Sequence, residues 1–117
     1  MIATTINPIG STIQLRDRIK YAEEGLRREI VMKDEQHHAI LVCLTGGTCL
    51  CTHTSFEEGL IIVIEGQGLF ILEGKEIALE PGVIIALPAH ALHAVSATTN
   101  LALLKIVDGQ ENWQEHH

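Results

Sequence analysis

The stretch that decides the fold is LIIVIEGQGLFILEGKEIALEPGVIIAL, residues 60–87. It contains four short runs of aliphatic residues, and turn residues that include glycine separate each run from the next. Runs of roughly four to eight β-favouring residues between turn signals are typical of strands, and Glu73-Gly74 between two of these runs predicts a tight hairpin. No helical segment lies between the runs to make parallel crossovers, so the stretch predicts part of a β-sandwich or barrel.

The same succession of apolar runs and turns continues on both sides. In chain order we predict strands at Arg28–Met32, His38–Leu44, Thr48–Thr54, Leu60–Ile64, Leu69–Glu73, Lys75–Leu79, Val83–Leu87, Leu92–Ala97 and Leu101–Val107. Short strands with turn signals about every 8 to 12 residues are typical of an all-β domain. The chain therefore divides into an N-terminal arm over residues 1–25, a barrel over 26–108 and a polar C-terminal tail over 109–117.

The N-terminal arm carries a helical signal. Ser11–Gln14 resembles a capping box, and Leu15, Ile19 and Ala22 follow at i, i+4 and i+7. This pattern predicts a short helix or helical turn that ends before Gly25.

Composition limits what the protein does. A chain of 117 residues forms one hydrophobic core and is too short for two ordinary domains. With a net charge of -7 and scattered basic residues it offers no basic face for nucleic acid, and no apolar run approaches the roughly 18 residues of a membrane span. Three cysteines cannot all pair within the chain, so we interpret them as reduced thiols. We therefore expect a cytoplasmic protein that binds neither nucleic acid nor membranes.

Two histidine-bearing blocks mark the candidate site, Thr52–Gly66 and Gly82–His93. His53 and His93 lie forty positions apart, and a small barrel that folds back on itself can bring both to one interior point. Imidazole is the commonest metal ligand near neutral pH. We predict that both histidines line one pocket, where they bind a divalent metal or, without metal, hydrogen-bond a ligand or each other.

The second block resembles the second conserved motif of the cupin superfamily, in the spacing Gly82-x5-Pro88-x4-His93. The stretch from His53 to Gly66 occupies the place of the first cupin motif. The resemblance covers residues 31–106, and residues 13–32 resemble the lead-in segment of small single-domain cupins. It implies an all-β double-stranded β-helix, the cupin jelly-roll barrel, whose metal ligands face inward and which follows a short helical or irregular N-terminal segment.

The chain also departs from the cupin pattern. The usual first motif is His-x-His, three or four residues, Glu, six residues and Gly; counted back from the closing glycine, the Glu position falls on Gly59 and the second His position on Ser55. In the second motif His90 replaces the glycine two positions after the proline, while His93 keeps the ligand position. Of the four usual ligands, the resemblance therefore leaves His53 and His93.

Strand periodicity adds a third candidate beside the first histidine. If His53 points into the barrel, the period of two places Cys49 and Cys51 on the same face. Cys51 is then either a soft metal ligand or a small buried apolar residue.

Other polar residues near the two motifs are weaker candidates. Glu57 and Glu58 lie close to the missing Glu position, and His90 lies beside His93. Adjacent acids before a strand and an imidazole in a loop are usually solvent-exposed. Whether any of them joins the site stays open at this point.

The position of the missing Glu predicts the two faces of the strand that follows. If Gly59 faces the barrel interior, Ile61 and Val63 face inward and contact a ligand, while alternate residues from Leu60 onward face outward. An outward row of three large aliphatic residues requires cover. We expect a homodimer packed sheet against sheet, with part of the N-terminal segment crossing to the partner.

Three functions from different classes fit these residues. The incomplete ligand set favours a cupin that binds a small organic ligand in the barrel, with one weakly held divalent metal (zinc, iron, nickel, copper or manganese) or none. A metal-dependent enzyme of the oxygenase or isomerase type is the first alternative. A structural or interaction barrel without a site is the second. The residues name neither the ligand nor the metal, and they leave enzyme activity open.

Overall fold

The computed structural model describes residues 6–53 and 58–108, and for residues 51–53 the backbone alone. The described chain has one short 3-10 helix and nine strands. They are η1 (Leu15–Arg18), β1 (Leu26–Lys33), β2 (His37–Leu44), β3 (Cys49–His53), β4 (Gly59–Glu65), β5 (Gly68–Leu72), β6 (Lys75–Leu79), β7 (Ile84–Leu87), β8 (His93–Ala97) and β9 (Leu101–Asp108). All nine predicted strands are present, and each boundary lies within two residues of the prediction. Within the described residues, no helix is long and apolar enough to cross a membrane.

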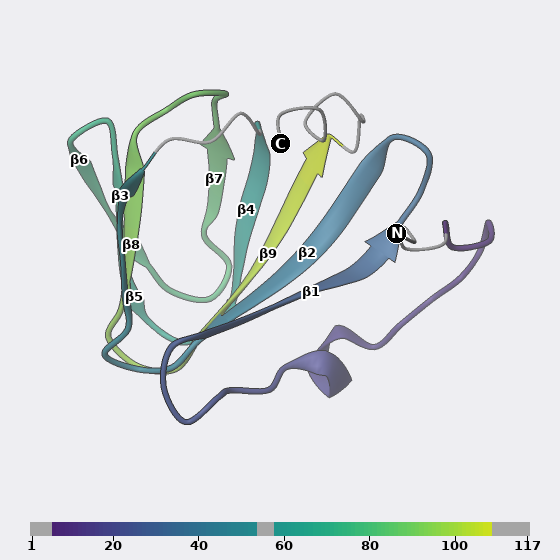
Figure 1. Ribbon diagram of the computed structural model, residues 1–117, viewed down its shortest axis with the longest axis horizontal. Helices are drawn as coiled ribbons and strands as arrows, with labels where there is room; N and C mark the ends of the chain where they lie inside the picture. The colour runs from purple at the N-terminus through teal and green to yellow at the C-terminus, as the bar shows by residue number, and fades with distance from the viewer. Residues whose placement is uncertain (1–5, 54–57, 109–117) are drawn as a thin grey trace.

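The strands form two sheets that face each other (Figure 1). The larger sheet has the order β1-β2-β9-β4-β7, and the smaller has the order β3-β8-β5-β6. All pairs are antiparallel, and several join strands that are distant in sequence, such as β2 with β9 and β3 with β8. This arrangement is a jelly roll. The predicted all-β double-stranded β-helix is therefore confirmed.

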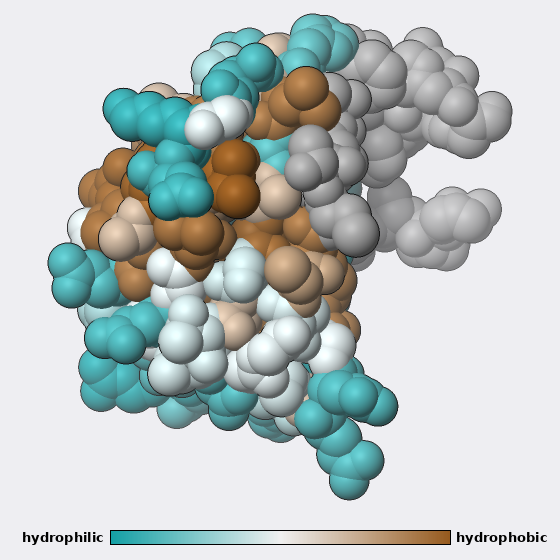
Figure 2. Space-filling view, turned by 90° about the vertical axis from the view of Figure 1, so that its left-hand side faces the viewer, coloured by the Kyte–Doolittle hydropathy of each residue, from teal (hydrophilic) through white to brown (hydrophobic). Residues whose placement is uncertain are grey.

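The main hydrophobic core lies between the two sheets. Along β4, Ile61 and Val63 are 4% and 2% exposed, whereas Leu60 is 44% exposed. The predicted alternation of inward and outward residues on this strand is therefore confirmed. Apolar surface is not confined to the interior, because hydrophobic residues also gather in the upper half of the side of the molecule where β3, β5, β6 and β8 lie (Figure 2).

The N-terminal arm runs alongside β1 and covers part of the outer face of the five-stranded sheet (Figure 1). Leu15, Ile19 and Tyr21 of the arm pack against a second buried cluster that includes Cys43 of β2. The Tyr21 hydroxyl donates to Glu65 Oε2 at 2.7 Å. Burial, and then the hydrogen bond to this carboxylate, raise the pKa of Tyr21. These contacts attach the arm to the sheet.

The predicted helical turn in the arm is present, but it begins differently. Helix η1 spans four residues, and its N-cap is Gln14, whose side chain accepts from the Arg16 N–H. The Ser11 hydroxyl instead donates to the Pro8 carbonyl at 2.7 Å, so the predicted capping box is wrong. A helix of four residues has too few turns for an i+7 stripe, and packing against the sheet decides its position.

Two turns need the conformations that glycine permits. Between β5 and β6, Leu72 pairs with Lys75, and φ values of 50° at Glu73 and 82° at Gly74 indicate a type I′ turn, which confirms the predicted hairpin. Gly66, the closing glycine of the first motif, has a φ of 93°. A β carbon there would overlap the Asn100 carbonyl oxygen, so only glycine fits.

Candidate functional site

His93 is the first residue of β8 and is buried, with 6% of its surface exposed. Its Nδ1 lies 3.0 Å from the Ala91 carbonyl oxygen. Because a carbonyl oxygen only accepts, Nδ1 carries the hydrogen, and Nε2 is the atom that accepts a hydrogen bond or binds a metal in a neutral imidazole. The ring stacks on Phe70, with centroids 5.7 Å apart and 17° between the ring planes. The two contacts hold the imidazole in one orientation.

His53 lies directly opposite His93 in the backbone register of β3 and β8. Directly opposed residues of an antiparallel pair have β carbons about 5 Å apart. The two histidine blocks, forty positions apart in sequence, therefore meet at one point of the four-stranded sheet. The side chains of His53 and of Cys51, the third candidate on this strand, lie outside the described part of the chain.

A β-bulge in β3 sets this register. Leu50 pairs with Val95 and His53 with His93, so three steps along β3 oppose two steps along β8. Leu50 lines the barrel interior, and Cys49 is exposed. The prediction that Cys49 shares an inward face with His53 is wrong, because it assumed an uninterrupted period of two along the strand.

A cavity of about 150 Å³ lies between the two sheets. Its apolar lining residues are Leu26, Val42, Leu50, Ile61, Phe70, Leu87, Val95 and Leu103. His93 lines the same cavity, together with Arg28 of β1 and Lys105 of β9. The cavity thus combines the candidate histidine with an apolar wall and with two basic side chains from the other sheet.

Arg28 and Lys105 were not predicted as site residues. For Lys105, the alternation of inward and outward residues along its strand does indicate an inward position. Lys105 occupies the same face of β9 as Leu103 and Val107, both of which are buried. A basic residue at an inward position of an otherwise apolar strand is out of place unless it serves a site. Every second residue of β9 from Leu101 onward faces inward, and this set includes Lys105.

The other predicted candidates lie at different places. On β4, Ile61 lines the cavity, whereas Val63 belongs to the core and does not line it. His90 is exposed in a turn with a φ of 65° and is not a lining residue of this cavity. Glu58 is exposed at a separate surface groove, and Glu57 lies outside the described residues.

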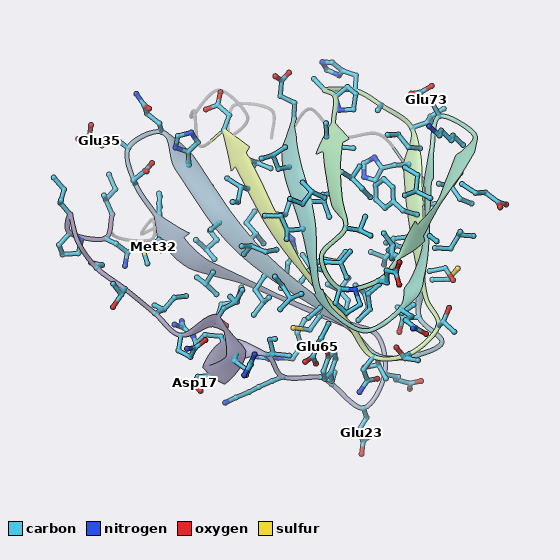
Figure 3. The ribbon with its side chains drawn as sticks, turned by 180° about the vertical axis from the view of Figure 1, so that it is seen from behind. Asp17, Glu23, Met32, Glu35, Glu65 and Glu73 are labelled. Carbon is cyan, nitrogen blue, oxygen red and sulfur yellow. The ribbon has the colours of Figure 1, made fainter. Side chains whose placement is uncertain are left out.

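The β5–β6 hairpin holds the segment that precedes His93. The Leu92 N–H donates to Glu73 Oε2 at 2.7 Å, and the Glu73 N–H donates to the Leu92 carbonyl at 2.8 Å. Figure 3 shows Glu73 at this end of the barrel and Glu65 at the other end. The two hydrogen bonds fix the chain immediately before the candidate histidine.

Gly59 occupies the position that the cupin resemblance assigns to a Glu ligand. A β carbon at Gly59 would overlap the Ile106 carbonyl oxygen and would lie 3.1 Å from the Val107 Cα. Both contacts are with the backbone of β9, the neighbouring strand. Backbone atoms of a paired strand cannot move away as the end of a flexible side chain can. A glutamate therefore does not fit here, and the sheet itself excludes this ligand.

The available donors suit a metal bound by imidazole. An imidazole that donates from Nδ1 to a backbone carbonyl, as His93 does, has the outer contact typical of metal-binding histidines. Among the residues that the structure describes, no group of three or more His, Cys, Asp or Glu side chains is arranged to hold a metal ion. Among the described side chains, His93 is the one that this contact suits to hold a metal, and the backbone register would make His53 its partner.

Three solved structures with similar folds give the context. A protein of unknown function from Streptococcus pyogenes, SPY1581, matches with a TM-score of 0.75 and 15% identity over 95% of this chain and 97% of that chain. KdgF from Halomonas sp. matches with a TM-score of 0.69 and 22% identity over 77% and 84%. Salicylate 1,2-dioxygenase from Pseudoaminobacter salicylatoxidans matches with a TM-score of 0.68 and 20% identity over 72% of this chain and 25% of that chain. Identities this low establish a shared fold alone.

The sequence comparisons agree with the fold. No curated protein matches the sequence significantly. A family model described as Cupin domain matches residues 34–108, which run from just before β2 to the end of β9. Because this match spans both histidine motifs and the paired strands that bring them together, the chain belongs to the cupin family.

Proposed function

We propose that this cupin binds a small organic ligand in the cavity between its sheets, with His93 and His53 as polar contacts and one weakly held divalent metal on the same pair. The observation that carries the proposal is the buried His93, which lines the cavity in a fixed orientation and lies opposite His53 in the register. A mostly apolar cavity with a few convergent polar groups is the usual form of a small-molecule site.

The number of protein ligands favours binding over turnover. Structural zinc sites use four protein ligands and catalytic zinc sites usually three. Here the histidine pair supplies two, and Gly59 excludes a third at the usual position. A metal on this pair keeps open positions, and when bound it supplies a Lewis acid that polarises the ligand group it contacts. Zinc, iron, nickel, copper and manganese are the candidates.

We also propose that the protein is a homodimer. Ile84 and Leu60 are 62% and 44% exposed on neighbouring strands of the five-stranded sheet, beside the part of that face that the arm covers. Exposed aliphatic residues that adjoin one another mark an interaction surface. A second copy packed sheet against sheet would cover them.

The test of the site is metal binding by protein purified without an affinity tag. Metal content is measured first, and isothermal titration with Zn²⁺ and Co²⁺ follows. We expect His53→Ala and His93→Ala each to abolish binding, while His37→Ala, at an exposed histidine of β2, leaves it unchanged. His93→Gln, which keeps most of the buried volume, separates loss of the ligand from loss of the fold, and thermal unfolding checks each variant.

Two results would change the conclusion. Unaltered metal binding by both alanine variants would contradict the assignment of the pair. Turnover of a bound organic ligand by metal-loaded protein would replace binding by catalysis and would favour an enzyme of the oxygenase or isomerase type.

A further inference from the structure

The cavity wall carries positive charge, although the chain as a whole is acidic. Of the eleven described residues that line the cavity, the three polar ones, Arg28, His93 and Lys105, are all basic. The net charge of the chain is -7. We propose that the ligand is a small carboxylate, whose charged end binds Arg28 and Lys105 and whose body lies on the apolar wall. This inference rests on the proposed function, because it names the chemical class of the ligand of the same cavity.

Arg28 is positioned to receive an anion. Its side chain is exposed and forms no hydrogen bond or ion pair with another described residue. The nearest carboxylate in sequence, Glu29, faces the other side of β1 and pairs with Arg18 at 2.6 Å. Arginine binds carboxylates through two parallel N–H donors, which gives both affinity and orientation.

Lys105 adds a second positive charge to the same wall. Arg28 pairs with Val42 on β2, and Val42 pairs with Leu103 on β9, two residues before Lys105 on the same face. Ordinary sheet spacings therefore put the α carbons of Arg28 and Lys105 about 12 Å apart. Two long side chains that line one cavity can span this separation to reach a single carboxylate.

The volume and the wall limit the rest of the ligand. A cavity of about 150 Å³ holds a molecule of about the size of benzene. Aliphatic side chains and Phe70 form most of the wall, so an apolar body is favoured over a polar one. Inorganic phosphate has no such body to place there. A carboxylate with a short apolar body uses both the charges and the wall, and its far end approaches His93 on the opposite sheet.

Benzoate and benzamide are suitable probes, because they have nearly the same shape and differ in charge. Isothermal titration gives the Kd of each for the unsubstituted protein, Arg28→Gln and Lys105→Gln. The matched control is Arg27→Gln, which removes the same charge from the opposite face of β1, where Arg27 donates to the Lys20 carbonyl. We expect benzoate to bind more tightly than benzamide. Each cavity substitution should raise the Kd of benzoate about tenfold to a hundredfold and leave that of benzamide unchanged. Arg27→Gln should change neither.

Several results would overturn the carboxylate assignment. They are equal binding of benzoate and benzamide, unchanged benzoate binding by Arg28→Gln and Lys105→Gln, no benzoate binding at millimolar concentration, or tighter binding of inorganic phosphate than of benzoate. Thermal unfolding confirms that each variant is folded. Arg28→Gln should still bind Zn²⁺ at least as tightly as the unsubstituted protein does, because the substitution removes a positive charge. Failure of the carboxylate assignment is therefore distinguishable from failure of the histidine pair.

Discussion

Replacing Gly59 by alanine should destabilise the barrel by about 2 to 4 kcal/mol. The added β carbon would overlap the Ile106 carbonyl oxygen and would lie 3.0 Å from the Ile106 carbonyl carbon. Strand β4 must then move away from β9 where Gly59 faces Val107 and Leu60 faces Ile106. Loss of about two ladder hydrogen bonds at about 1 kcal/mol each gives the lower figure, and loosened packing gives the rest. Domains are typically stable by about 5 to 15 kcal/mol, so the variant should fold but be visibly weakened.

Urea unfolding measures this effect. With an m-value of about 1 to 3 kcal/mol/M, the midpoint should fall by about 1 to 2 M. Gly74→Ala is the control, because nothing lies within 4 Å of a β carbon there and its cost comes from the positive φ alone, about 1 kcal/mol. Gly59→Glu should be at least as destabilised as Gly59→Ala and should gain no metal affinity. A Gly59→Ala midpoint equal to that of the unsubstituted protein would refute the steric exclusion of the third ligand.

Three further properties can be measured independently. Tyr21 is the single tyrosine, and burial and its hydrogen bond to Glu65 raise its pKa, so ultraviolet titration should show it un-ionised at pH 10. The stability that the un-ionised Tyr21 contributes is full below about pH 10 and is lost as the pH rises through the raised pKa. Exposed Cys49 should react rapidly with a thiol reagent, whereas Cys43, buried and with its pKa raised by burial, should react slowly, as peptide mapping would show. Ile84→Lys should convert a dimer to monomers in light scattering at about ten micromolar, and a monomeric unsubstituted protein would exclude the homodimer.

The fold was predictable from the sequence because its determinants are local. Each strand is bounded by turn residues, and the type I′ turn at Glu73-Gly74 follows from two residues alone. The inward position of Ile61 follows from a period of two over residues 59–63, where the register with β9 has no shift. The start of η1 was not predictable in the same way, because a helix of four residues depends on tertiary contacts more than on its capping sequence.

The site was only partly predictable, because its register depends on a bulge. The extra residue between Leu50 and His53 changes which residues share a face. No residue type in that segment predicts the bulge. A strict two-residue period therefore predicted an inward position for Cys49, which is exposed. The two histidine motifs did indicate that His53 and His93 belong together, and the backbone register has them directly opposed. Arg28 and Lys105 belong to neither histidine motif, and only the alternation of inward and outward residues along their strands indicates that they face the cavity.

The missing glutamate and the basic cavity wall are connected through charge. In the cupin pattern a glutamate beside the histidines offsets the charge of a divalent cation, and Gly59 leaves this chain without it. The cavity instead presents Arg28 and Lys105, whose charges would repel a cation bound at the proposed histidine pair. A negatively charged group bound between Arg28 and Lys105 would offset their charges and would attract the cation. A carboxylate ligand supplies such a group, so we expect ligand and metal to increase each other's affinity by the same factor.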